Sequence, residues 1–241
     1  MTQLSPAQAR LLLDGYLDDI CRADIPRLGE VRQHPATLRQ LLRALARLTG
    51  SELRYATLAA DLAPVAPTIQ PETISTLVAL LERLFVVELV PPQVTALRSR
   101  ARLRTSPKVH LADPALAAAA LDADEEALVG DLNTCGILFE SAVVHDLTVL
   151  TEALGGAVHH YRDSNGHEID AVLTFPGGRW AAVEVKLGGP QALSGAESLR
   201  KAVRQIDATR PPSFMAVVTG TGFTADLGEG VITFPLSALG A

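Results

Sequence analysis

The feature that most constrains the fold is a tight hairpin in the second half of the chain. Two segments with strand character, residues 169–175 and 179–187, are separated only by Pro176-Gly177-Gly178. Proline and glycine at such a point favour a tight turn between paired strands. If the turn is centred on its first glycine, residues whose numbers sum to 354 face each other, for example Val172 and Ala182. The chain is therefore predicted to contain an antiparallel strand pair whose register depends on where the turn is centred.

Alternation along these two segments separates an apolar face from a charged one. The apolar face, which we expect to be core, contains Ile169, Ala171, Leu173, Phe175, Ala181, Val183, Val185 and Leu187. On the other face the register pairs Asp170 with Glu184, and Glu168 with Lys186. The simplest interpretation of the second pair is an ordinary cross-strand ion pair. A turn shifted by one residue would place Asp170 and Glu184 on different faces.

Two carboxylates directly opposite each other destabilise a sheet, because their Cβ atoms lie only about 4.5–5.5 Å apart. A divalent cation removes that penalty, and Mg²⁺ or Mn²⁺ takes one or two carboxylates together with water and phosphate oxygens. Asp170 and Glu184 are therefore the candidate metal ligands. Lys186 lies on the same face and would hold the attacking water or stabilise charge on a phosphoryl group.

A third carboxylate stands out in a helical pattern over residues 132–154. Glu140 falls on the apolar stripe of that helix, which consists of Ile137, Val143, Val144 and Leu147. Glutamate is rarely buried without a partner. Either a buried Arg or Lys pairs with Glu140 for structural reasons, or Glu140 completes the metal site beside the hairpin.

The elements around the hairpin predict an α/β fold. Strands are expected at 157–162, 213–219 and 231–234 in addition to the hairpin, with a helix around 196–208. The first three strands form an antiparallel meander, and the crossover helix permits a parallel fourth strand. The order from residue 132 is therefore helix, three strands, helix and strand.

The first half of the chain is predicted to be helical. Helices are expected at 35–48, after an N-cap at Ser51 and from Pro71, followed by a strand at 85–90. This is the order of a winged helix-turn-helix. An Ala-rich helix follows Asp113 as its N-cap. We predict an N-terminal helical segment (1–34), an all-helical winged-helix-like domain (35–112) and a domain with the mixed sheet (113–241).

Charge differs between the halves of the chain, whose net charge is −6. Residues 1–108 contain 14 Lys and Arg against 10 Asp and Glu, whereas residues 109–241 contain 7 against 17. A nucleic-acid contact therefore depends on the first half or on a bound metal. One basic stripe, spaced two residues apart, consists of Arg98, Arg100, Arg102 and Arg104. It is either a solvated edge or a surface that binds phosphate.

Other classes of protein are disfavoured. Cys21 and Cys135 lack Cys or His neighbours at ligand spacing, which argues against disulfides and structural zinc. No apolar run approaches the length of a membrane span. The first twenty residues carry Arg10, Asp14 and Asp18, unlike a signal peptide, so we expect a cytoplasmic protein with no membrane partner.

Together these residues resemble the PD-(D/E)XK nuclease superfamily, whose restriction-endonuclease-like core runs α-β-β-β-α-β. The matching positions are Glu140, Asp170 and Glu184-Val185-Lys186. More narrowly, the chain resembles the unknown-function domain with a winged helix that lies C-terminal to an AAA+ ATPase module in bacterial and archaeal proteins. That narrower likeness is carried by 16–20, 24–25, 106–113, 161–163, 168–170 and 183–186.

The resemblance implies a Mg²⁺- or Mn²⁺-dependent phosphodiesterase with Asp170, Glu184 and Glu140 at the metal and Lys186 at the water. His160 and Arg162 would contact phosphate of DNA or RNA. No phosphate loop G-x-x-x-x-G-K-[ST] occurs, so a separate AAA+ ATPase is the expected partner. The alternatives are a non-catalytic module, which senses nucleic acid or docks onto that ATPase or a second copy, and a winged-helix transcription regulator.

Overall fold

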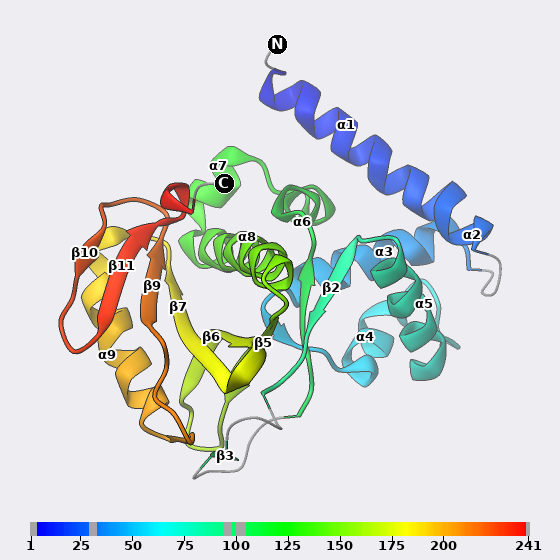
Figure 1. The fold of residues 1–241 in the computed structure, drawn as a ribbon. Helices are drawn as coiled ribbons and strands as arrows, with labels where there is room; N and C mark the ends of the chain where they lie inside the picture. Colours follow the sequence, from blue (N-terminus) through cyan, green and yellow to red (C-terminus); the bar gives the residue numbers. More distant parts are fainter. Residues whose placement is uncertain (1–3, 29–32, 94–97, 100–104, 240–241) are drawn as a thin grey trace. The chain divides into compact units, whose positions relative to one another are not determined.

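The computed structural model describes residues 4–28, 33–93, 98–99 and 105–239 (Figure 1). The chain divides into two compact units. Unit 1 comprises residues 1–89 and 109–134, and unit 2 comprises residues 90–108 and 135–241. The sequence-based domain boundaries at residues 34 and 112 stay predictions. Within the described residues the fold is mixed α/β, with a helical N-terminal part, as expected from the sequence.

Unit 1 is mainly helical. Its helices are α1 (Pro6–Asp19), α2 (Ile25–Arg27), α3 (Pro35–Arg47), α4 (Tyr55–Leu62), α5 (Pro71–Arg83), α6 (Pro114–Leu121) and α7 (Glu125–Gly130), with a π-helix, η1 (Ile20–Asp24). Short strands β1 (Ser51–Glu52), β4 (Lys108–Leu111) and β2 (Val87–Val90) form a sheet in the order β1-β4-β2. Strand β2 corresponds to the strand expected at 85–90, whereas β1 and β4 are additional strands in the domain described from sequence as all-helical.

Local signals place most helix boundaries of unit 1. Pro35 and Pro71 occupy the first turn of α3 and α5, where a missing N–H costs nothing. The Asp113 carboxylate accepts a hydrogen bond from the N–H of Ala115 at 2.7 Å and caps α6. The expected cap at Ser51 is wrong. Ser51 lies in β1, and Arg54 precedes α4, because the chain pairs in the small sheet before the helix begins.

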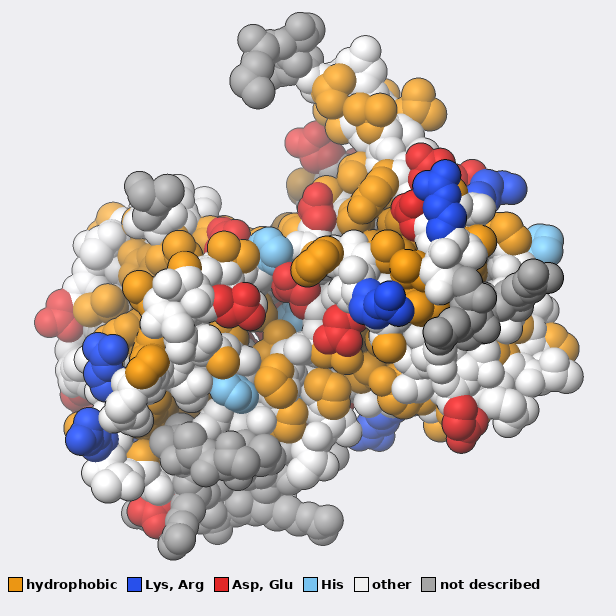
Figure 2. Space-filling view, turned by 45° about the vertical axis from the view of Figure 1, so that its right-hand side comes forward, with side chains coloured by type: hydrophobic (Ala, Val, Ile, Leu, Met, Phe, Trp, Pro, Cys, Tyr) orange, Lys and Arg blue, Asp and Glu red, His pale blue; other side chains and the backbone are white. Residues whose placement is uncertain are grey.

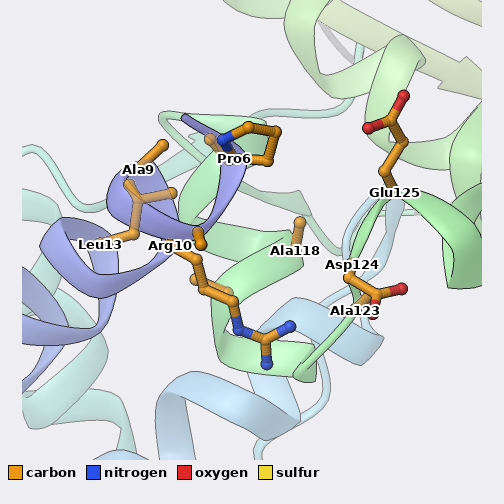
Figure 3. A pocket seen from close by; sticks show the side chains of 11 residues that line it. Pro6, Ala9, Arg10, Leu13, Ala118, Ala123, Asp124 and Glu125 are labelled. Carbon is orange, nitrogen blue, oxygen red and sulfur yellow. The ribbon is translucent and has the colours of Figure 1, made fainter. Parts of the chain in front are cut away.

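The N-terminal helix of unit 1 leaves apolar side chains at the surface. Leu11 and Leu12 of α1 are 73% and 60% exposed. Figure 2 shows hydrophobic side chains gathered on the surface of part of the molecule. A cavity of about 410 Å³ lies beside the same helix and is lined mainly by alanines, with Arg10, Asp124 and Glu125 around it (Figure 3). Arg10 also forms an ion pair with Asp122. The residues that line this cavity do not form a candidate catalytic or metal-binding site.

Unit 2 is a sheet covered on both faces. After α8 (Leu132–Ala153), strands β5 (Ala157–Arg162), β6 (Glu168–Phe175) and β7 (Arg179–Lys186) form an antiparallel meander. Helix α9 (Ala192–Val203) connects β7 to the parallel strand β9 (Met215–Thr219), and β11 (Val231–Pro235) is parallel to β9. With β10 (Ala225–Asp226), the sheet order is β10-β11-β9-β7-β6-β5. Strands β3 (Arg98–Ser99) and β8 (Ile206–Asp207) form a separate pair.

Both faces of this sheet are core, which corrects the expectation of one apolar and one charged face. On one face, Val143, Val144 and Leu147 of α8 pack with residues such as Ala171 and Val183. On the other, Ala196 and Leu199 of α9 pack with Val172, Ala182 and Val217. The charged residues are therefore confined to the strand ends.

Helix α8 is, in the part of the chain that the structure describes, the single helix whose length and composition suit a membrane span. Its buried residues pack in the core of unit 2, against the sheet. A long apolar stripe of this kind is also what a core helix requires.

The predicted hairpin register is confirmed over most of the strand pair. The turn carries Gly177 and Gly178 with φ of +80° and +73°, and Val172 pairs with Ala182 as the sum of 354 requires. The paired positions run from Phe175 and Arg179 to Ala171 and Val183.

The alternation along β6 changes next to its first residues. His159 of β5 pairs with Val172 and Tyr161 pairs with Ile169, so two steps on β5 correspond to three on β6. This is a β-bulge, and it re-aims the residues between the two pairs. Ile169 consequently lies in the same core cluster as Val172, not with Ala171 as we expected.

Candidate functional site

Asp170 lies in the bulge, where the ladder between β6 and β7 ends. Its Oδ2 accepts a hydrogen bond from the backbone N–H of Val185 at 2.8 Å. The Asp170 side chain thus accepts the hydrogen bond that the N–H of Val185 would otherwise donate to a backbone carbonyl of β6 if the ladder continued. Asp170 is held against β7 beside Glu184, although the backbone pair predicted for these two residues is not formed in the described ladder.

Glu184 and Lys186 form an ion pair at the carboxyl end of β7. The Nζ of Lys186 lies 2.6 Å from Oε1 of Glu184, whose side chain is 8% exposed. Gly195 of α9 packs against the stem of the lysine, since a Cβ at that position would lie 3.1 Å from Cγ of Lys186. The two charged groups are therefore packed into the end of the sheet rather than free in solvent.

Glu140 of α8 has a buried cationic partner. Nζ of Lys108, the first residue of β4, lies 3.1 Å from Oε1 of Glu140 and 2.8 Å from Oε1 of Glu168. The Lys108 side chain is 3% exposed. The structural explanation that the sequence left open for Glu140, a buried lysine, is thus realised. The expected pair of Glu168 with Lys186 is wrong, because Glu168 contacts Lys108 and lies 3.9 Å from Arg162.

The pKa values of the acidic groups reflect burial and crowding. Burial, and next the charge of Asp170, raise the pKa of Glu184 to about 8. Burial and Asp170 also raise the pKa of Glu140 to about 7, although Lys108 opposes the shift. Burial raises the pKa of Asp170 too, against the pull of Lys108 and the N–H of Val185. The charge of Asp170 thus acts on both of the other carboxylates, Glu140 and Glu184.

The cations respond to the same cluster. Burial alone would lower the pKa of Lys108, but Glu140, Asp170 and Glu168 outweigh it and raise the value. The pKa of Lys186 is also raised, because Glu184 and Asp170 outweigh burial. For Glu168, burial is outweighed by Lys108 and Arg162, and its pKa is lowered. The carboxylate cluster is defined here as Glu140, Glu168, Asp170 and Glu184, with Lys108 and Lys186 as its buried and half-buried cations.

The cluster satisfies only part of what a metal centre needs. Within the described residues, no group of three or more His, Cys, Asp or Glu side chains is arranged to hold a metal ion. Two carboxylates nevertheless suffice for Mg²⁺, which retains water ligands. Asp170 and Glu184 fit that donor set, and Glu140 is committed to its ion pair with Lys108.

Of the residues predicted to contact nucleic acid, some lie within the described residues and some do not. Arg98 lies in β3, whose backbone pairs with β8, and Arg100, Arg102 and Arg104 fall outside the described residues. Arg162 ends β5, is exposed, and lies near Glu168. His160 is fully buried, with Nε2 3.0 Å from the carbonyl oxygen of Ser106. A phosphate contact by His160 is therefore excluded, and its ring has a structural role in unit 2.

Lys108 is the residue of this site that the sequence analysis missed. Its partners are 32 and 60 positions away, so no local spacing connects them. One signal was available. The chain contains only three lysines, Lys108, Lys186 and Lys201, among 21 basic residues. Two of these three belong to the cluster.

The comparisons with known proteins place the chain among domains without an assigned activity. The model of the domain of unknown function DUF8612 matches residues 2–127, more than half of the chain. The chain belongs to this family. The model of a second domain of unknown function, DUF4143, matches residues 135–239, and DUF4143 is known from AAA-associated contexts. No curated protein and no solved structure shows detectable similarity to the chain.

The two matched regions of this DUF8612 protein both contribute to the cluster. Glu140, Asp170, Glu184 and Lys186 lie in the DUF4143 match, whereas Lys108 lies in the DUF8612 match. A DUF4143 segment taken alone would therefore lack the cation between Glu140 and Glu168.

Proposed function

We propose that unit 2 is a PD-(D/E)XK-type domain that hydrolyses phosphodiester bonds of DNA or RNA with Mg²⁺ or Mn²⁺. One observation carries the proposal. Carboxylates from three elements meet: Glu140 on α8 and Glu168 on β6 share Lys108, and Asp170 on β6 accepts a hydrogen bond from the N–H of Val185, next to Glu184 on β7. In keeping with this, Asp170 raises the pKa of Glu140 and Glu184. Stability alone disfavours buried like charges, so such a cluster favours a function.

Charge balance supports a divalent ion. When ionised, the four carboxylates outnumber Lys108 and Lys186, and a bound divalent cation would favour the ionised forms of Glu140 and Glu184 by lowering their raised pKa values. Asp170 and Glu184, with the Val185 carbonyl, would hold the metal, and Glu140 would act through water. When bound, the ion would supply a water of lowered pKa and polarise a phosphoryl oxygen. Lys186, held by Glu184, would orient the attacking water, and Lys108 would keep Glu140 and Glu168 in place.

A metal titration tests this proposal. We expect 10 mM Mg²⁺ or Mn²⁺ to raise the Tm of the full chain by about 3–6 °C for an affinity near 1 mM, because an ion that binds only the folded state stabilises it. Asp170→Asn should abolish the shift, whereas Glu197→Gln on the exposed surface of α9 should preserve it. An equal shift in wild type and Asp170→Asn would refute Asp170 as a ligand.

Cleavage provides the second test. Wild-type protein should nick plasmid DNA or cleave RNA in the presence of Mn²⁺, and Lys186→Ala should reduce the rate at least a hundredfold, in line with loss of one electrostatic catalytic group. Lys201→Ala, which removes the one lysine outside the cluster, is the matched control. Cleavage that persists unchanged in Lys186→Ala would contradict the role assigned to this residue.

A second candidate is a non-catalytic module that senses nucleic acid or docks onto a separate AAA+ ATPase. The buried ion pair of Lys108 with Glu140 favours this candidate, because Glu140 is one of the three carboxylates assigned to the metal site and is already paired with a lysine. The AAA-associated context of DUF4143 supports an ATPase partner for either candidate. Metal-independent nucleic-acid binding without cleavage would favour this alternative.

A further inference from the structure

A cavity of about 490 Å³ lies next to the candidate site in unit 2 and has no assigned role. It is formed by the loop after β7, the start of α9, and the loop after β9, and is lined among others by Pro190, Leu193, Thr219 and Phe223. Its volume is within the range of about 300–1,000 Å³ that is usual for ligand pockets. The part of its wall given by described residues contains no charged side chain.

The position of the cavity connects it to the carboxylate cluster. Strands β7 and β9 are parallel, and their last residues, Lys186 and Thr219, are paired neighbours. Thr219 lines the cavity, and Gly189 in its wall comes three residues after Lys186. Ligands of open α/β sheets bind at the carboxyl ends of parallel strands. The cavity and Lys186 therefore share one end of the sheet.

The two loops of the wall are held close together by glycine. A Cβ on Gly189 would lie 3.0 Å from the carbonyl oxygen of Thr221, which is tighter than an ordinary contact. Gly222, next to Thr221, has a φ of +133°, a conformation that favours glycine. Glycine at positions 189 and 222 thus allows the two loops to pack against each other. Loops that were free to separate would not require glycine at these positions.

The rim of the cavity carries two unusually exposed apolar side chains. Leu193 is 69% exposed and Phe223 is 78% exposed. Single exposed apolar residues need no explanation, but two at the mouth of one apolar cavity form a surface that a ligand can cover. An exposed aromatic ring is the group on which a nucleobase stacks without regard to its identity.

We propose that this cavity binds a nucleobase whose phosphate lies toward Lys186. The uncharged, apolar wall suits the planar base, and the cation at the neighbouring strand end suits the phosphate. The inference rests on the proposed function, because it assigns the substrate of that site as an unpaired nucleotide. The shared chemistry, a base carrying a phosphate, is found both in single strands and in free nucleotides.

The proposal is tested by fluorescence anisotropy with the full chain in EDTA. The probes are fluorescein-labelled oligothymidylate and an abasic deoxyribose-phosphate oligomer of equal length. Wild type should bind oligothymidylate about tenfold more tightly than the abasic oligomer, as expected for one stacked base. Phe223→Ala should remove that preference, and Phe223→Trp should restore it.

Matched variants separate the cavity from the rest of the surface. Phe214 precedes β9 at the opposite end of the same strand, and Leu154 is as exposed as Leu193. Phe214→Ala and Leu154→Ala should leave the preference unchanged. Thermal unfolding of each variant confirms that it is folded. If thymidine 5′-monophosphate competes with the oligonucleotide, the ligand is a free nucleotide. If it does not compete at millimolar concentration, the ligand is a single-stranded nucleic acid. Both outcomes support the proposal.

Three outcomes would overturn the proposal: no binding of oligothymidylate, equal affinity for the two oligomers, or an unchanged preference in Phe223→Ala. Binding of an apolar peptide in place of the oligonucleotides would identify the cavity as a protein-docking site instead. These failures are distinct from failure of the proposed function, because metal stabilisation and cleavage depend on Asp170 and Lys186 and are measured without the oligomers.

Discussion

In unit 1, the Arg39 side chain lies 2.7 Å from an oxygen of Asp14, and these side chains are 35% and 41% exposed. In unit 2, Lys108 lies at a similar distance from Glu168, but its side chain is 3% exposed. The first pair is shielded by water and contributes little to stability. In the second pair Glu168 is still 33% exposed, but the Lys108 ammonium has lost its hydration, so the lysine depends on its acidic partners. Similar distances thus imply different energetics, and burial makes the difference.

The largest expected effect tests the buried side of this comparison. Lys108→Met should lower the free energy of unfolding by about 3–5 kcal/mol, because it leaves Glu140 and Glu168 without their buried cation. Urea denaturation of the full chain measures the loss. Adding Glu140→Gln to Lys108→Met should recover part of it, since a buried charge is then removed. A loss as small as that of a surface pair would show that the cluster is hydrated.

A smaller effect comes from pH. The pKa of Glu184 rises from 4.5 to about 8 on folding and that of Glu140 to about 7. A raised pKa means that the folded state binds protons more tightly, so this stability is fully present below pH 4.5 and is lost as pH rises toward 8. Without metal, unfolding free energy should fall by about 2 kcal/mol between pH 6 and pH 8 from Glu184 alone.

Chemical denaturation in EDTA at each pH measures this trend, and Glu184→Gln should flatten its upper part. Stability that rises with pH over this range would mean that the carboxylates are not crowded.

The smallest effect sharpens the exposed side of the comparison. Arg39→Met should change the free energy of unfolding by only about 0.5 kcal/mol, since exposed ion pairs contribute between about 0 and 1 kcal/mol. The measurement is the same urea titration as for Lys108→Met. A loss of several kcal/mol at Arg39 would remove the distinction between the two units.

The sequence alone determined the local features of this protein. The register between β6 and β7 followed from Pro176-Gly177-Gly178 and the alternation on either side, because a tight turn links strand positions only a few residues apart. Asp113 could be identified as a helix cap because its hydrogen bond reaches only to Ala115. Glu140 was recognisable as out of place, since helical periodicity assigns each residue to a face.

Only the tertiary structure decided which groups meet. The bulge at Asp170 needs the neighbouring strand β5, and burial of the second sheet face needs α9. Lys108 reaches Glu140 and Glu168 across 32 and 60 residues. No periodicity connects positions so far apart, because such contacts arise when whole elements pack and depend on the shape of the core. The sequence could name the unusual acid, but only the fold could supply its partner.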